Sequence, residues 1–343
     1  MTGRADRQRL AAAVHVTNGD IAVDLLRRAG LAADGLSWAD VLHEGPVPGG
    51  LADDELRRVR AGFIAAADGV DAGEVRRRFE ERDHILAAGR AGEYVLWFEA
   101  DLYDQLQIAQ ILAALGGLGV PPERVTLVCI GEYPGIAHFG GLGQLEPGQF
   151  PGLLEAAVPL TAGALELGAA AWAALRARDP GGLGAIAASR SRELRFLGEA
   201  FDRLSREYPS TRDGLSLTER RILAATPPGG AAAAAVVFGR LGAREARPFL
   251  GDLWCFRMMT RLAGARVPLL ELDPPGDRVT AATRLRPTDA GRRVLRGEAD
   301  HVALNGIDRW VGGVHLRGQA ARWRWDEGTE SIAAPGPAED PSV

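Results

Sequence analysis

Short apolar segments alternate with stretches of helical spacing in the first 150 residues. Uninterrupted apolar runs of a few residues are typical of strands buried on both faces, and helices between them permit parallel connections. The pattern therefore predicts an α/β domain over residues 1–150, with a parallel sheet covered by helices on both faces. The expected strands are residues 14–17, 36–42, 94–98 and 125–130.

Helices are expected between these strands, where apolar residues recur every three or four positions. Asp20 is expected to cap the first helix, and Gly30 to end it. A glycine-rich loop over residues 131–143 follows the last strand. The helices are predicted over residues 21–29, 53–67, 72–88 and 102–115.

The rest of the chain is predicted to be mostly helical. We expect a helical connector over residues 151–212, a winged-helix-like domain over 213–330 and a disordered tail over 331–343. Three helices, a two-stranded hairpin and a further helix follow one another in the middle segment, which is the order of a winged helix-turn-helix. Ser216 is expected to cap the helix at 217–225, and Thr288 to begin the last helix. The elements expected here are helices at 161–178, 193–206, 217–225, 231–238, 249–262 and 288–295, and strands at 267–272 and 281–285.

The composition is that of an ordinary globular protein, with 46% hydrophobic and 25% charged residues. No apolar run approaches 18 residues, so no membrane span is expected. The apolar stretch at residues 10–14 is too short for the core of a signal peptide. Cys129 and Cys255 are the only cysteines, and both lie in apolar segments. Two buried thiols suit a reducing compartment, so we expect a cytoplasmic protein.

Charge is unevenly distributed along the chain. Residues 1–150 carry 22 acidic and 14 basic side chains, whereas residues 151–343 carry 23 acidic and 26 basic ones. The acidic first half argues against a nucleic-acid channel there, because it would repel phosphates. The weakly basic second half permits nucleic-acid binding without indicating it.

Polar residues follow every expected strand, whereas the strands themselves are apolar. In a parallel α/β sheet, ligands bind beyond the carboxyl ends of the strands, where the strand order reverses. We therefore expect a ligand site at this edge of the sheet. The residues after the four strands are Thr17, Asn18, Gly19 and Asp20; Asp40, His43 and Glu44; Glu99, Asp101, Tyr103, Asp104 and Gln105; and Glu132, Tyr133 and His138.

Several of these residues have a structural alternative to a functional role. Asn18 to Asp20 form either a simple turn before a helix or a site where helix N–H groups meet an anion. Asp20 would repel a bare phosphate, so a hydroxyl, an amine or a metal-bridged phosphate fits better. His43 and Glu44 are either an acid–base pair or a loop fixed by hydrogen bonds. Asp101 is either catalytic or a favourable charge at a helix N-terminus.

The sequence leaves metals and cofactors undetermined. Histidines and carboxylates suitable as ligands lie on different loops without a tight spacing. HExxH, CxxC, EF-hand, Walker, GxGxxG and GxSxG motifs are all absent from the sequence. The candidates are therefore assigned by position alone: His43, Glu44 and Asp101 as catalytic residues, and Thr17, Asn18, Gly19, Asp20, Glu99, Gln105 and His315 as ligand-binding residues.

Two features of the second half bear on function. His315 lies in a polar and aromatic cluster with Asp308, and this cluster is either a docking strand or a contribution to the site across the domain boundary. The expected recognition helix, residues 251–262, has Arg257 and Arg261 beside large apolar side chains. DNA-reading helices usually expose several polar side chains on one face, so the composition favours an interior helix.

Longer motifs resemble the bacterial family called domain of unknown function 1835. That family has no assigned activity, and the resemblance implies only that both halves of the chain form one functional unit. Members often carry Ser where Ile21 stands here, so this chain lacks a hydroxyl nucleophile after Asp20. The motifs are HVTNGD at 15–20, DVLHEGP at 40–46, LWFE at 96–99, GLGQL at 141–145, PSTR at 209–212 and NGIDRW at 305–310.

Three functional hypotheses follow from the residues. The first is a small-molecule enzyme, a hydrolase or a transferase, or a binding protein, which acts on a phosphorylated or nucleotide-like ligand by acid–base or metal-assisted chemistry. The second is a ligand-responsive transcriptional regulator that binds DNA through the winged helix, and the third is an adaptor without a ligand. The sequence leaves the oligomeric state undetermined.

Overall fold

The computed structural model describes residues 12–227, 229–319 and 321–334. The chain forms two compact units. Unit 1 consists of Met1–Phe201 with the turn Gly312–Val314, and unit 2 consists of Asp202–Val311 with His315–Val343. Every helix within the described ranges is too short or too polar to cross a bilayer.

Unit 1 is built on a five-stranded sheet in the order β2-β1-β3-β4-β5. The first four strands are parallel and β5 is antiparallel to β4, so the predicted α/β fold with a parallel sheet is confirmed. Sheet-forming Val, Trp and Phe side chains fill the central strands. The strands are β1 (Val14–Thr17), β2 (Gly35–Ser37), β3 (Tyr94–Glu99), β4 (Val125–Ile130) and β5 (Val158–Pro159).

The strand expected over residues 36–42 ends early, at Ser37. Trp38 still donates its backbone N–H to Thr17, but the chain then leaves the sheet. Asp40 pairs with Arg60 through a contact of 2.7 Å, and both side chains are almost completely buried. This ion pair holds the following loop against a helix, where the sequence predicted a continued strand.

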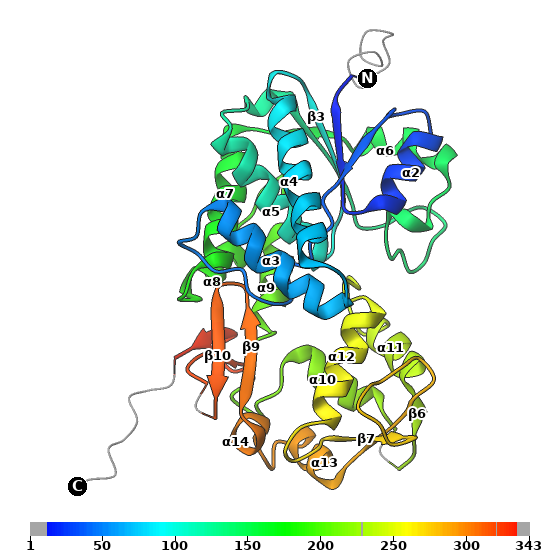
Figure 1. Cartoon of the computed structure of the whole chain (residues 1–343), viewed down its shortest axis with the longest axis vertical. Helices are drawn as coiled ribbons and strands as arrows, with labels where there is room; N and C mark the ends of the chain where they lie inside the picture. The colour runs from blue at the N-terminus through cyan, green and yellow to red at the C-terminus, as the bar shows by residue number, and fades with distance from the viewer. Residues whose placement is uncertain (1–11, 228, 320, 335–343) are drawn as a thin grey trace, which may run out of the picture. The chain divides into compact units, whose positions relative to one another are not determined.

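Helices cover both faces of the sheet, as predicted. α2 and the short α6 pack on the face that presents Val95 and Trp97, and α4 and α5 lie on the other side in Figure 1. The helices of this unit are α2 (Asp20–Arg28), α3 (Asp53–Asp68), α4 (Ala72–Ala88), α5 (Leu102–Gly117), α6 (Phe150–Leu153), α7 (Ala162–Arg176) and α8 (Gly181–Ala187), and α9 (Leu197–Ser205) contains the boundary to unit 2. Single turns of 3-10 helix are η1 (Gly89–Ala91), η2 (Pro122–Arg124), η3 (Leu142–Gln144), η4 (Pro147–Gln149) and η5 (Leu154–Ala156).

Two local expectations in unit 1 are wrong. Asp20 does not cap α2: Gly19 occupies the cap position without a side-chain bond, and Asp20 is the first helical residue. Its carboxylate there still interacts favourably with the helix dipole. No helix was expected between those at 161–178 and 193–206, but α8 begins there at Gly181.

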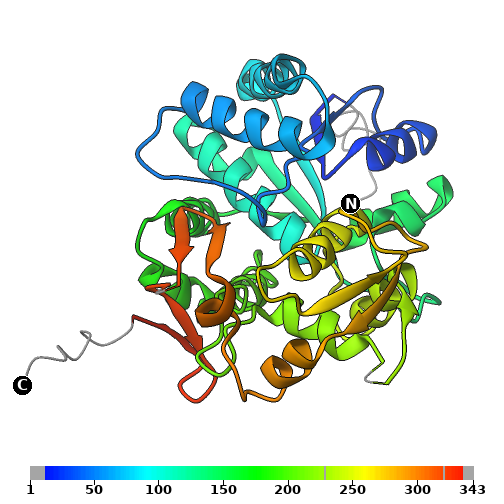
Figure 2. The same ribbon diagram turned by 60° about the horizontal axis from the view of Figure 1, so that its bottom comes forward.

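Unit 2 begins with helices and a small sheet. Three antiparallel strands have the order β6-β8-β7, and Figure 2 shows them beside the neighbouring helices. Ser216 caps α10 as predicted, whereas Thr288, expected to be the first residue of the last helix, caps α13. A helix expected over residues 231–238 instead begins at Ala234, because the two residues before it pair with β8. The elements are α10 (Leu217–Ala225), β6 (Ala232–Ala233), α11 (Ala234–Gly242), α12 (Asp252–Ala263), β7 (Leu270–Asp273), β8 (Arg284–Pro287) and α13 (Asp289–Leu295).

Two hairpins follow in unit 2, together with the short α14 (His301–Asn305). β9 (Ile307–Val311) pairs with β10 (Val314–Gly318), and β11 (Arg324–Asp326) pairs antiparallel with β12 (Ser331–Ala333). The disordered tail expected over residues 331–343 is therefore wrong for Ser331–Ala333, because their backbone joins a sheet. The residues after position 334 lie outside the described ranges.

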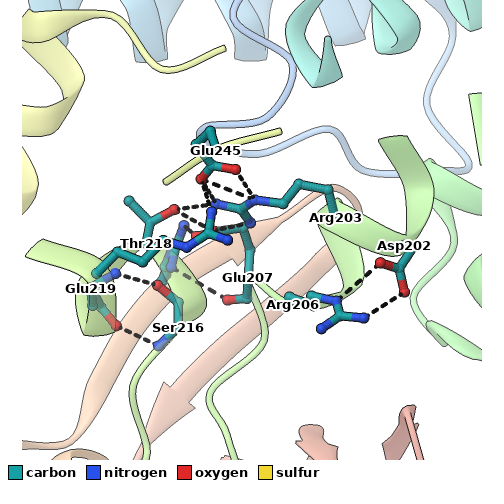
Figure 3. A network of polar contacts seen from close by, with 10 residues as sticks. Asp202, Arg203, Arg206, Glu207, Ser216, Thr218, Glu219 and Glu245 are labelled. Carbon is teal, nitrogen blue, oxygen red and sulfur yellow. Dashed lines mark hydrogen bonds and ion pairs between the residues drawn. The ribbon is translucent and has the colours of Figure 1, made fainter. Parts of the chain in front are cut away.

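A buried network of charges holds several segments of unit 2 together (Figure 3). Arg203 of α9 contacts Glu207 and Glu245 at 2.7 Å each. Arg309 of β9 contacts the other oxygen of Glu207 at 2.6 Å, and Thr218 of α10 donates to Glu207. Burial raises the pKa of Glu207, but the two arginines and the hydroxyl outweigh it and lower the pKa to about 2.

We predict that Glu207→Gln destabilises the protein by roughly 3 kcal/mol or more, because it removes the buried negative charge that Arg203 and Arg309 share. Chemical denaturation of the full chain, followed by tryptophan fluorescence, measures the loss. Asp202→Asn is the control, since Asp202 and Arg206 form an exposed pair. It should cost less than about 1 kcal/mol.

The pH dependence separates this explanation from a simple packing defect. A carboxyl group whose pKa is lowered by folding contributes stability above its ordinary pKa of about 4.3 and loses it as the pH falls. The difference between the wild type and Glu207→Gln should therefore shrink between about pH 4.5 and pH 2. A difference that stays constant over this range would contradict the assignment.

Candidate active site at the ends of β1 and β3

The strand order of unit 1 reverses between β1 and β3. The chain passes from β1 to β2 on one side, whereas β3 lies on the other side of β1. Ligands of open α/β sheets bind at the carboxyl ends of the strands next to such a reversal. The residues that follow β1 and β3 therefore lie where a ligand is expected to bind.

Asn18 joins the two strand ends through its side-chain amide. Its Nδ2 atom lies 3.1 Å from Glu99 Oε1 and 3.1 Å from each carboxylate oxygen of Asp104. Asn18 follows β1, Glu99 ends β3 and Asp104 lies in the first turn of α5. One amide group thus holds two carboxyl groups from different elements close together.

The backbone supplies further hydrogen bonds to the two carboxyl groups. Glu99 donates its own N–H to Asp104 Oδ2, and Leu142 donates its N–H to Glu99 Oε1, both at 2.5 Å. Asp104 is fully buried and Glu99 is nearly so. These donors partly offset the cost of removing two acids from water.

Burial raises the pKa of both carboxyl groups. For Asp104 the neighbouring Glu99 and Asp101 carboxylates raise the pKa further, and for both groups the hydrogen bonds from backbone and Asn18 oppose the shift. Two acids that share one buried site cannot both ionise easily. The pair therefore keeps a proton to higher pH than exposed carboxyl groups do, as a general acid requires.

Asp101 contributes a third carboxyl group and also caps α5. It accepts a hydrogen bond from the Asp104 N–H at 3.0 Å, so its carboxylate caps the N-terminus of the helix. One oxygen each from Glu99, Asp101 and Asp104 lie within 4.8 Å of one another. Carboxylate oxygens at this spacing suit a hard divalent cation such as Mg²⁺, so these residues are the ones that could hold a metal.

The glycine-rich loop after β4 covers Glu99. Gly141 has a φ of 139°, which other residues rarely adopt, and a Cβ atom there would lie 2.3 Å from Glu99 Oε2. The glycines of such a loop can let its backbone approach a ligand closely. In the structure they let the backbone approach a carboxyl group of the protein itself.

His43 packs against Tyr103, a residue that contacts the site. The Tyr103 hydroxyl donates to the Asn18 carbonyl at 3.3 Å, and the buried His43 ring lies edge-on to Tyr103 with centroids 5.9 Å apart. The loop that carries His43 is fixed by Arg60, which donates to the Glu44 carbonyl at 2.8 Å. His43 thus contacts a residue that bonds to Asn18, and Glu44 lies in the loop that Arg60 holds.

The other predicted site residues fall into two groups. Thr17 bonds to Gly19 within the turn after β1, and the Gln105 amide donates to the Glu99 carbonyl, so these residues support the site. Asp20 is exposed and lines a separate, shallow cavity with Asp24 and Arg28. His315 in unit 2 contacts Asp308 at 2.6 Å and stacks on Trp310 within its own hairpin.

Sequence reasoning underrated Asp104 and did not single out two buried arginines. Asp104 is among the residues expected after the third strand, but no local pattern distinguishes it as the residue that bonds to both Asn18 and Glu99. Arg60 and Arg82 lie on the buried faces of α3 and α4, among Leu56 and Phe79. An arginine within an apolar helical stripe is the signal that could have identified them, because charged side chains are rarely buried without a partner.

The chain matches no protein-family model, and the comparison with curated proteins found no match either.

We predict that Glu99→Gln raises the melting temperature of the ligand-free protein by roughly 2–4 °C at pH 8. A carboxyl group whose pKa is raised by folding destabilises the native state as the pH rises through that pKa, and glutamine removes the titration. The gain should shrink as the pH falls toward about 4.3. Thermal unfolding over a pH series measures it.

Glu132→Gln is the matched control, because Glu132 follows the neighbouring strand β4 and is exposed. It should leave the melting temperature unchanged. A stabilisation that is equal in both variants, or independent of pH, would show that the buried position of Glu99 is not its cause.

Proposed function

We propose that unit 1 is a small-molecule enzyme whose site lies at the ends of β1 and β3. The observation that supports this most directly is the Asn18 amide, which holds the buried carboxyl groups of Glu99 and Asp104 together. A proton shared by this pair can be donated to a leaving group, and the ionised form can accept one from a nucleophile. Acid–base chemistry of this kind suits a hydrolase or a transferase.

A phosphorylated or nucleotide-like ligand is our proposed substrate class. The first N–H groups of α2 have no partner within their helix and can donate hydrogen bonds to an anion. Three carboxyl groups close by would repel a bare phosphate when ionised. Metal-assisted chemistry is therefore the alternative to the acid–base chemistry above: a divalent cation held by the ionised Glu99, Asp101 and Asp104 would displace the shared proton. When bound, such a cation would neutralise charge on the phosphate.

His43 and Glu44 have a supporting role in this proposal. His43 packs against Tyr103, whose hydroxyl bonds to the Asn18 backbone, so it helps to set the position of that residue. The resemblance to domain of unknown function 1835 agrees with a site built around residues 15–20 and 96–99, although it supplies no reaction. A cytoplasmic location is also proposed, because Cys129 and Cys255 are buried thiols outside any disulfide.

A ligand panel tests the proposal. We expect at least one nucleotide or sugar phosphate to raise the melting temperature when Mg²⁺ is present, and to do so much less without it. Asn18→Ala and Glu99→Gln should abolish the shift, whereas Glu132→Gln should keep it. Ligand-induced shifts that survive in both site variants would refute the location of the site.

A second candidate function rests on the order of elements in unit 2. Helix α10, strand β6, helices α11 and α12 and the hairpin β7–β8 follow one another, and β6 pairs with β8. We propose that this segment is a winged helix-turn-helix, which makes a ligand-responsive DNA-binding regulator the alternative.

The surface chemistry weighs against DNA binding. Most of the large side chains of α12 are buried, among them Trp254 and Met258. On the hairpin, Arg284 faces Asp273 and Arg286 faces Glu271, so each basic residue has an acidic neighbour across the strands. Paired charges of this kind attract phosphates weakly.

The two functions differ in their response to salt. The regulator predicts duplex DNA binding at low salt that weakens when Arg257 and Arg261 are both changed to Gln, with a steep salt dependence. Gel-shift titration of random and genomic duplexes measures this. We expect the protein to leave the mobility of the duplexes unchanged. Tight binding by the wild type that is lost in the double variant would favour the regulator.

A further inference from the structure

Unit 1 contains a second cavity, of about 440 Å³, among α3, α4, α5 and α7. This volume lies within the range of small-molecule sites, which are mostly apolar with a few polar groups. The wall combines aromatic and small apolar side chains with arginines. Its lining residues include Trp38, Arg57, Arg60, Arg82, Ala113 and Trp172.

Arg82 is the unusual group in this wall. It lies on the buried stripe of α4, is 5% exposed, and its guanidinium lies 3.8 Å from the centre of the Trp38 ring and 4.6 Å from that of Phe79. Its Nη1 atom is buried and has no hydrogen-bond partner among the described residues. A buried cation with an unused donor is costly unless another group completes it.

Three arginines and three aspartates line the cavity, but two of the guanidinium groups share one carboxylate. Arg60 is matched by Asp40, and both are buried. Arg57 and Arg82 share a single carboxylate, Asp83, at 2.9 Å each, and the buried Nε of Arg57 also lacks a partner within the part of the chain that is described. Asp53 lines the rim but is exposed, where water and salt screen its charge.

The cavity is distinct from the acidic site. Asp104 lies in the first turn of α5, whereas Ala113, Ala114 and Gly117 line the cavity from the last turns of that helix. A rise of 1.5 Å per residue places Asp104 and Ala113 about 14 Å apart along the helix axis. The two sites also differ in charge, since one is a cluster of acids and the other combines three arginines with three aspartates.

We propose that this cavity binds a flat aromatic or heteroaromatic molecule with one negative charge, such as a carboxylate or a phosphate ester. The anion would accept hydrogen bonds from the donors of Arg82 and Arg57 that have no partner among the described residues. The ring would lie against the apolar wall formed by Ala113, Ala114 and Trp172. This binding does not depend on the reaction proposed for the acidic site.

The fluorescent anion 8-anilinonaphthalene-1-sulfonate tests the proposal, because it is an aromatic molecule with a single negative charge. We expect saturable binding to the folded full chain. Arg82→Met should weaken it at least tenfold, and Arg78→Met should leave it unchanged, because Arg78 is exposed on the same helix. The neutral analogue N-phenyl-1-naphthylamine should bind at least tenfold more weakly than the anion.

A second variant keeps the test decisive if Arg82→Met unfolds. Ala113→Phe fills the cavity and leaves every charge in place, so it should also weaken binding at least tenfold while near-ultraviolet circular dichroism stays native. Equal binding of the neutral and anionic dyes, or unchanged binding in Ala113→Phe, would overturn the proposal. Glu99→Gln should bind the dye like the wild type, so a failure here is distinguishable from a failure at the acidic site.

Discussion

The parallel pairing of β1 with β3 is the constraint on which the candidate site depends. Val14 lies beside Tyr94 and Thr17 beside Trp97, so both strands run toward the same edge of the sheet. Asn18 leaves β1 at that edge, next to the end of β3. Any other neighbour for β1 would separate the amide from the carboxyl groups of Glu99 and Asp104.

Burial of carboxyl groups has opposite consequences in the two units because their neighbours differ. Glu207 in unit 2 lies between two arginines, which lower its pKa and make it a stabilising group. Glu99 and Asp104 lie beside one another, and burial raises the pKa of each. Buried acids that lower the stability of the fold are typical of functional sites. In a structural network every charge and hydrogen bond can be matched, whereas a functional site must keep donors or acceptors available for its ligand.

Buried arginines show the same distinction within unit 1. Arg60 has a buried partner carboxylate and donates to backbone carbonyls, so it locks the loop after β2 to α3. Arg82 instead lies over aromatic rings, and one of its donors is unused among the described residues. The fold therefore supplies the partners of the Arg60 guanidinium, whereas the ligand proposed for the cavity would supply a partner for that of Arg82.

The sequence by itself determined most elements and the class of the fold. Apolar periodicity located α4 and β4 to the residue, and the capping pattern located the start of α10, because these features depend on neighbours a few positions away. Tertiary structure alone decided which polar residues meet. Asn18 and Asp104 are 86 positions apart, and the importance of Asp104, the indirect role of His43 and the early end of β2 all depend on contacts that no local pattern encodes.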